Sequence, residues 1–490
     1  MAHKHKILAF ESSRFQRACP DIVVDRFTNL PDDVAHHILS LLSFRNIARV
    51  GCVSKKCREF YQCIPNLDFD STAYAHSTQA RLRLLSCLDR FLFQRGEKKI
   101  QSFRIRWFFE GSASNGNEQF RVMSWIHYAV RCNVENLNLE LSVYELLRTL
   151  ELPSCIFLCE SLRHLVVDVL NAGGKILKTP SFACSSNLQS LKLKNVTIEE
   201  GFCKWISWCC KCIKQLWLEH IRKTETISIQ NSSLESFSLV GDYRLGFYDL
   251  HMLSVLNISG EKLGNIHIHW KTRIRGINYL NIYAPNLKDL TLIGIFMNQL
   301  YLGKLLRLEK SILYPIGLHD FDKAFEVLSS VSRGKILALI GDIIKVVFRQ
   351  GSLPPPLHDI CCFSMLGTLN DDLVPPMALL LKAMPNLIRL RISNAVIPFN
   401  SSTNSSGFNI SYWKSQNLTF VHHLEDVSIP IFNGDNEVEF AAYLLENARN
   451  LKKMVIYHSG QHHSTAIKWL QKKSFCYSTA KVIFMEKSSS

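Results

Sequence analysis

Long apolar runs are absent from this 490-residue chain. A membrane-spanning helix needs about 20 consecutive apolar residues. The best candidate, Ile336–Phe348, is shorter and is interrupted by Asp342 and Lys345. The apolar run Ile7–Phe10 is also too short for the core of a secretory signal. We therefore expect a chain that does not enter a membrane and that works in the cytoplasm or the nucleus, where its 16 cysteines are thiols.

The sequence also lacks the short motifs that accompany common catalytic sites. It contains no P-loop, no dinucleotide-binding glycine pattern, no nucleophile elbow and no zinc-protease helix motif. Cys203, Cys209, Cys210 and Cys212 lie close together, but their spacing suits an expected helix better than paired zinc ligands. Adjacent histidines point apart on a helix or strand, so they chelate poorly. We expect no catalytic residue, no metal and no cofactor.

Acidic residues are few compared with basic ones, and the formal net charge is +15. Such a surface favours acidic partners. The basic residues are scattered, however, and form only short pairs such as Lys98-Lys99 and Lys472-Lys473. We interpret them as a solvated basic surface. No element typical of groove reading is present, so we do not expect a nucleic-acid partner.

A short helical segment is expected near the N-terminus, between Leu30 and Tyr61. Pro31 suits the first position of a helix, and two aspartates follow it where the helix dipole favours negative charge. Val34, Ile38 and Leu42 recur at helical spacing and give one wide apolar face. Two or three short helices of this size are too small to be stable alone. The segment therefore either caps the rest of the chain or docks on another protein.

The same segment resembles an F-box. The resemblance rests on Leu30-Pro31-Asp32-Asp33-Val34, Ile38-Leu39, Leu42 and Val53-Ser54-Lys55-Lys56-Cys57-Arg58. One departure is Cys57, which stands where most plant-type F-boxes have Trp. The resemblance implies docking to a Skp-type adaptor and, through it, to a cullin. The adaptor-facing residues that it implies are Leu30, Pro31, Ile38, Leu39, Leu42 and Val53.

Beyond about Ser71 one pattern returns, L-x-x-L-x-L with apolar substitutes. Successive copies between Val134 and Ile277 lie 19 to 28 residues apart, in or near the range of about 20–29 residues of leucine-rich repeats. We therefore predict an α/β fold, an irregular leucine-rich-repeat (LRR) solenoid with a parallel sheet on its concave side. The copies begin at Val134, Leu162, Leu188, Ile213, Leu234, Leu253, Ile277, Leu287, Leu387, Leu424 and Leu451.

The connections between copies differ along the chain. Helical spacing of apolar residues predicts helices over Phe202–Ile213, Phe321–Val331, Pro376–Met384 and Val438–Ala448. Between Leu234 and Leu292 short connections with glycines predict flatter, strand-rich coils. Ile277 and Leu287 are too close for two full coils, so we expect a turn at Ala284-Pro285-Asn286 between two strands. Outward alternation on the strands nominates six target contacts: Lys192, Lys194, Trp217, Glu219, Tyr279 and Lys288.

The C-terminal stretch resembles the FBD-type end region of plant F-box repeat proteins. The matching residues include Leu424-Glu425-Asp426-Val427 and Leu451-Lys452-Lys453-Met454. The domain boundaries that we predict are a disordered tail over 1–26, an F-box over 27–63, a solenoid over 71–417 and FBD-like repeats over 418–480. Two loops are expected to interrupt the array, a polyproline segment within Gln350–His358 and a mobile stretch over Asn400–Gly407.

Our leading interpretation is a substrate receptor of an SCF-type (Skp adaptor–cullin–F-box) ubiquitin ligase without catalysis of its own. The F-box would bind the adaptor, and the repeat surface would bind a target protein. A second interpretation is a repeat scaffold outside ubiquitin transfer, with a degenerate F-box, as Cys57 suggests. A third is an enzyme hidden in the irregular middle of the array, which a deep pocket with converging titratable groups would reveal.

Overall fold

The computed structural model describes most of the chain. The predicted tail over 1–26 and the predicted mobile stretch Asn400–Gly407 lie outside the described residues, as does part of the predicted polyproline segment. No helix in the described part is long and apolar enough to cross a membrane. The described residues are 27, 29–72, 77–109, 115–143, 152–170, 176–177, 186–199, 201–222, 224–242, 253–271, 276–316, 320–348, 355–393, 408–431, 435–458, 464–477 and 480–486.

The chain divides into two compact units, Met1–Pro65 and Asn66–Ser490. The described part of the first unit consists of three short helices, α1 (Asp32–Ser40), α2 (Phe44–Val50) and α3 (Lys55–Cys63), as the sequence predicted. Ser54 caps α3, where its Oγ accepts a hydrogen bond from the Cys57 backbone N–H at 3.1 Å. Phe60 is buried in this unit, and the rings of Phe27 and His36 pack edge-on against it.

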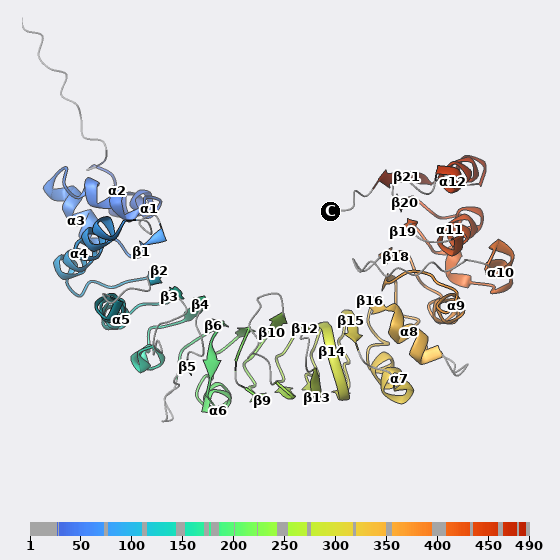
Figure 1. The fold of residues 1–490 in the computed structure, drawn as a ribbon, viewed down its shortest axis with the longest axis horizontal. Helices are drawn as coiled ribbons and strands as arrows, with labels where there is room; N and C mark the ends of the chain where they lie inside the picture. Colours follow the sequence, from blue (N-terminus) through green and yellow to red (C-terminus); the bar gives the residue numbers. More distant parts are fainter. Residues whose placement is uncertain are drawn as a thin grey trace, which may run out of the picture. The chain divides into compact units, whose positions relative to one another are not determined.

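The second unit is built on one long ladder of parallel strands, which we call the main ladder (Figure 1). Alternate side chains of each strand point into the core, as at Leu191 and Leu193, which have no exposed surface. The predicted parallel sheet is therefore confirmed. In order along the ladder, the strands are β1 (Asn66–Asp70), β2 (Ser102–Phe109), β3 (Asn136–Val143), β4 (His164–Leu170), β6 (Ser190–Lys194), β8 (Gln215–Glu219), β10 (Ser236–Asp242), β12 (Asn265–Lys271), β14 (Asp289–Leu302), β15 (Lys310–Ile316), β16 (Ile336–Ile340), β17 (Cys362–Leu366), β18 (Arg389–Ser393), β19 (Asp426–Ile431), β20 (Lys453–His458) and β21 (Lys481–Glu486).

Helices cover one face of the main ladder and leave the opposite face open (Figure 1). All four helices that apolar spacing predicted are present, although α6 ends at Trp208 rather than at Ile213. The segment Ile336–Phe348 forms β16 followed by a short buried helix, α8. The helices are α4 (Thr78–Arg95), α5 (Asn115–Arg131), α6 (Gly201–Trp208), α7 (Phe321–Ser330), α8 (Gly341–Phe348), α9 (Val374–Lys382), α10 (Ile410–Ser415), α11 (Asp435–Asn447) and α12 (Ser464–Tyr477), with 3-10 turns η2 (Ser154–Leu158) and η4 (Thr419–His422).

In the middle of the unit a second ladder of strands takes the place of helices (Figure 1). It contains β9 (Thr226–Gln230), β11 (Val255–Ser259), β13 (Ile277–Tyr283) and the last part of β14, all parallel. This confirms the strand-rich coils that short connections predicted, and the turn before Leu287 is also present. A separate small pair joins β5 (Ile176–Leu177) to β7 (Thr197–Ile198).

The pattern identified strands correctly but not the ladder to which each belongs. The copies that begin at Leu253 and Ile277 form β11 and β13 of the second ladder. The main-ladder strand between them, β12, follows Leu263 and buries Ile266 and Ile268. These residues fit the same pattern, although they were not among the copies that we counted.

Candidate binding surfaces

Four large apolar side chains in the described part of the N-terminal unit are exposed. Val34 and Ile38 lie one turn apart on α1 and are 39% and 37% exposed. Leu41, just after α1, and Val53, just before α3, are each 74% exposed. So many exposed apolar side chains in a unit of three short helices are typical of a surface that binds another protein. We call Val34, Ile38, Leu41 and Val53 the exposed apolar set.

The predicted adaptor-facing residues divide between surface and core. Ile38 and Val53 belong to the exposed apolar set. Pro31 is exposed and directly precedes α1, whereas Leu30 and Leu42 are half-buried. Five of the six predicted residues therefore retain accessible surface.

Leu39 needs a correction, because it has no exposed surface and belongs to the core of the chain. In a short helix, the packing of neighbouring elements decides which side of a wide apolar face is covered. The nominated residues omitted Val34 and Leu41, which are accessible. The helical spacing between Val34 and Ile38 was the signal that could have found the first.

Four predicted target contacts lie together on the open face of the main ladder. Lys192 and Lys194 of β6 stand in register with Trp217 and Glu219 of β8. The Lys192 Nζ lies 4.7 Å from the centre of the Trp217 ring, a cation–π contact. The Lys194 Nζ lies 3.1 Å from a Glu219 carboxylate oxygen, and the Trp217 Nε1 donates to the other oxygen at 3.3 Å.

The other two predicted contacts lie elsewhere. Tyr279 is on β13 in the second ladder, so it does not share the open face with Lys192 and Trp217. The prediction was wrong for Tyr279 because alternation along a strand shows which side chains point outward, but not on which side of the coil the strand lies. Lys288 is exposed and directly precedes β14 of the main ladder.

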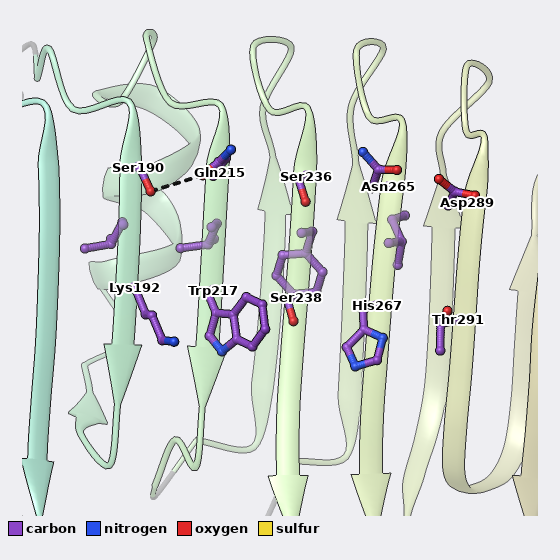
Figure 2. Close-up of a pocket in the computed structure, with 14 residues that line it drawn as sticks. Ser190, Lys192, Gln215, Trp217, Ser236, Ser238, Asn265, His267, Asp289 and Thr291 are labelled. Atoms are coloured by element: carbon purple, nitrogen blue, oxygen red, sulfur yellow. Dashed lines mark hydrogen bonds between the residues drawn. The ribbon is translucent and has the colours of Figure 1, made fainter.

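The open face has a hollow of about 510 Å3 around the two serines of β10 (Figure 2). In the register of the ladder, Ser238 lies between Trp217 of β8 and His267 of β12. Ser238 is 5% exposed, and its Oγ has no hydrogen-bond partner in the described structure. Burial lowers the pKa of His267, so its imidazole is neutral at neutral pH. The hollow therefore offers a hydroxyl, a neutral imidazole and an indole side by side.

The charges near the N-terminal end of the open face are paired with one another. Arg106 of β2 lies 3.0 Å from Asp70 and 3.0 Å from Glu140, and Arg104 lies 2.9 Å from Glu140. Desolvation acts to lower the pKa of Arg106, but Glu140 and Asp70 outweigh it and the pKa is raised. Desolvation likewise acts against the charge of Lys194, but Glu219 outweighs it and raises the pKa. This stretch is electrostatically compensated within the chain.

The cysteine cluster around α6 does not assemble ligands. No group of three His, Cys, Asp or Glu residues in the described part could hold a metal ion. Cys210 is fully buried, and burial strongly raises the pKa of its thiol. Cys203 and Cys209 are half-buried, while Cys212 is exposed, so the predicted burial does not extend to Cys212.

Comparison with known proteins identifies three regions of the chain. A model of the F-box domain matches residues 27–60, and a model of the FBD matches 419–456. Between them, a model of the LRR repeats of the FBD-associated F-box protein At5g56370 matches 122–256. The chain therefore combines an F-box, LRR repeats and an FBD, as F-box/FBD/LRR-repeat proteins do.

Curated proteins that are similar to the chain include several from Arabidopsis thaliana. The putative F-box/FBD/LRR-repeat protein At4g03220 is 24% identical over 469 residues, which cover 89% of each chain. The FBD-associated F-box protein At1g66310 is 23% identical over 454 residues, covering 89% of this chain and 90% of the relative. The F-box/LRR-repeat protein At4g14103 is 30% identical over 141 residues, 28% of this chain and 35% of the relative.

The family regions fall on defined elements of the fold. The F-box match contains α1 and α2 and all but the end of α3, so it includes the whole exposed apolar set. The FBD match contains β19, α11 and the first four residues of β20, and both strands lie in the main ladder. The FBD is therefore part of the repeat array, and α12 and β21 follow it. The boundaries over 1–26, 27–63, 71–417 and 418–480 stay predictions.

The unusual F-box residue Cys57 is 3% exposed. It therefore presents almost no surface to a partner in this structure. A Trp side chain at this position would have to be accommodated in a packed interior, and overpacking a core typically costs about 1–3 kcal/mol. Cys57→Trp is therefore a poor probe of partner binding, because a change in folding would be mixed with a change in affinity.

Proposed function

We propose that this F-box/FBD/LRR-repeat protein is the substrate-recognition subunit of an SCF-type ubiquitin ligase. Its F-box would bind a Skp-type adaptor and, through it, a cullin. The open face of its main ladder would bind the target protein. The proposed place of action is the cytoplasm or the nucleus.

The observation that carries the proposal is the exposed apolar set within the F-box match. Spaced apolar side chains on short helices fit a groove of complementary shape on a partner. Fully burying one such side chain contributes about 1.5–3 kcal/mol. Together, Leu41 and Val53 therefore supply enough apolar surface to determine whether the adaptor binds.

No chemistry on this chain is needed for the proposed function. A receptor that holds a target beside a charged ubiquitin-conjugating enzyme accelerates transfer by raising the effective concentration of the target's lysines. The open face suits this role because it runs along the whole main ladder and is not covered by helices. Its hollow at Ser238 and the aromatic ring of Trp217 are candidate anchors for the target.

The direct test is the affinity of the full chain for a purified Skp-type adaptor. We expect Leu41→Ala combined with Val53→Ala to weaken binding by about 100-fold or more, because two apolar anchors are lost. Both side chains are largely exposed, so the unfolding midpoint should not change. The control is Phe93→Ala on α4, which removes an 88% exposed apolar side chain outside the F-box. Equal binding by the double variant and the control would refute the docking assignment.

A second candidate function is a repeat scaffold that acts outside ubiquitin transfer. Cys57, in place of the Trp that most plant-type F-boxes have, is the observation that favours it. The same titration separates the two functions. A wild-type chain that fails to bind adaptor while its repeat array is folded would favour the scaffold.

A further inference from the structure

Three exposed cations gather on the open face near the end of the main ladder. Arg389 and Arg391 alternate on β18, and Lys453 lies on β20. On β19, between them, Asp426 is in register with Arg389 and Lys453, and Ser428 is in register with Arg391. These side chains line a hollow of about 400 Å3, which we call the β18–β20 hollow. Its wall also includes Ser364 and Tyr457.

The cations of the β18–β20 hollow are not paired with carboxylates. No described carboxylate oxygen lies within 4.0 Å of Arg389, Arg391 or Lys453, unlike the compensated charges at the other end of the ladder. Arg389 donates instead from Nε to the Cys362 sulfur at 3.0 Å, although Asp426 is its neighbour in register. The hollow therefore has a net positive charge that the described residues do not neutralise.

Arg391 lies at the centre of this arrangement. Its neighbours in register are Ser364 on β17 and Ser428 on β19, both half-buried and both able to donate a hydrogen bond. A guanidinium presents a planar fork of donors that matches two oxygens of a phosphate or a carboxylate. One guanidinium flanked by two hydroxyls, with two further cations nearby, forms a site for an anionic group.

We propose that the β18–β20 hollow binds an anionic segment of the target protein, with Arg391 on its phosphate or carboxylate oxygens. The inference rests on the proposed function, since it takes the open face as the target-binding surface. It also gives the FBD a role, because the FBD match supplies Ser428 and Lys453 from β19 and β20. The FBD would complete an anion site that β18 alone leaves open on one side.

The hollow around Ser238 does not fit the same ligand. Lys192, the one cation among the described residues that line it, already lies against the Trp217 ring, and Asp289 adds a carboxylate to its wall. An anionic segment would gain little there. Because its positive charges are not paired with carboxylates, the β18–β20 hollow is the better site on the open face for an anionic segment.

The test measures binding of labelled peptides to the full chain by fluorescence anisotropy. The probes share one neutral sequence and carry a central run of phosphoserine, glutamate or serine. Arg391→Gln should weaken binding of the anionic probes by about tenfold, the usual effect of losing a charge-assisted hydrogen bond. Arg391→Lys, which keeps the charge without the fork, should give an intermediate loss. Lys310→Gln on β15 is the matched control, because it removes one exposed charge from the same face outside the hollow.

The outcomes separate a built site from a merely basic surface. Stronger binding of the phosphoserine probe than of the glutamate probe assigns the site to a phosphorylated segment, and the reverse assigns it to a carboxylate-rich one. Equal binding of the serine probe, or equal losses for Arg391→Gln and Lys310→Gln, would overturn the proposal. Adaptor affinity is measured on the same samples. If Arg391→Gln binds adaptor normally, a failure of the peptide assay is a failure of this inference and not of the proposed function.

Discussion

A buried ion pair fixes the first helices of the repeat array to the main ladder, and removing it should unfold that end locally. Arg81 of α4 is 1% exposed, and Glu118 of α5 is 7% exposed. The Arg81 Nε and Nη2 each lie 2.6 Å from a Glu118 oxygen, and the Trp107 Nε1 of β2 donates to the same carboxylate at 3.3 Å. Glu118→Ala would leave a buried guanidinium without its carboxylate.

The expected cost of Glu118→Ala is about 3 kcal/mol, at the lower end of what breaking a buried ion pair costs. The lower end applies because Arg81 keeps its hydrogen bond to the Phe108 carbonyl and its contact with the Trp107 ring. Replacing both charged residues by apolar ones, Arg81→Met with Glu118→Leu, should change the free energy of unfolding little, because neither helix then carries a buried unpaired charge. The double variant is therefore the internal control.

The assay is hydrogen exchange followed by mass spectrometry, because each coil contacts mainly its neighbours and the loss should stay local. For Glu118→Ala we expect protection of peptides from Thr78–Arg95 and Ser102–Phe109 to fall by roughly 100-fold, the equivalent of about 3 kcal/mol. Peptides from Val374–Lys382 should be unchanged. The reasoning is refuted if Glu118→Ala changes protection less than about fivefold, or if the double variant is as damaging as the single one.

Two further predictions concern the middle and the end of the array. Gly294 has φ +132°, and an added Cβ would lie 2.0 Å from a carbonyl oxygen of β12, so Gly294→Ala should lower stability by about 1–3 kcal/mol or more. The check compares the denaturant unfolding midpoints of Gly294→Ala and Gly264→Ala, because the Cβ added at Gly264 would lie 3.8 Å from its nearest heavy atom. Equal midpoints for the two variants would contradict the prediction. Desolvation acts to raise the pKa of Glu446, but Lys473 and Lys414 outweigh it and the pKa is lowered. Lys473 lies on α12, so its ion pair with Glu446 stabilises that helix at neutral pH. This stabilisation is lost as the pH falls through the lowered pKa of Glu446, and acid should therefore expose Ser464–Tyr477 to hydrogen exchange. Glu446→Gln should flatten this dependence, and an unchanged pH profile would argue against the pairing.

The repeat pattern in the sequence determined most of the strands, because alternate burial on a short strand needs apolar residues at fixed spacing. The helical spacing of apolar residues determined the N-terminal module and four of the helices that cover the ladder. Helical spacing did not predict α4, α5, α8, α10 or α12. The repeat pattern also left several strands without a copy: β1, β2, β5, β7, β9, β12, β15, β16, β17 and β21. At β12, Leu263, Ile266 and Ile268 fit the pattern all the same.

The sequence determined that the side chains of Tyr279 and Leu39 belong to regular elements of known period. Only the tertiary structure decided that Tyr279 lies on the second ladder and that Leu39 is covered while Leu41 is exposed. The tertiary structure likewise decided which charges are paired. Arg106 forms ion pairs with carboxylates from two neighbouring strands, whereas the neighbours of Arg391 in register are serines. The physical reason is that period and polarity are properties of one segment, whereas burial and charge compensation depend on which segments the fold places beside it.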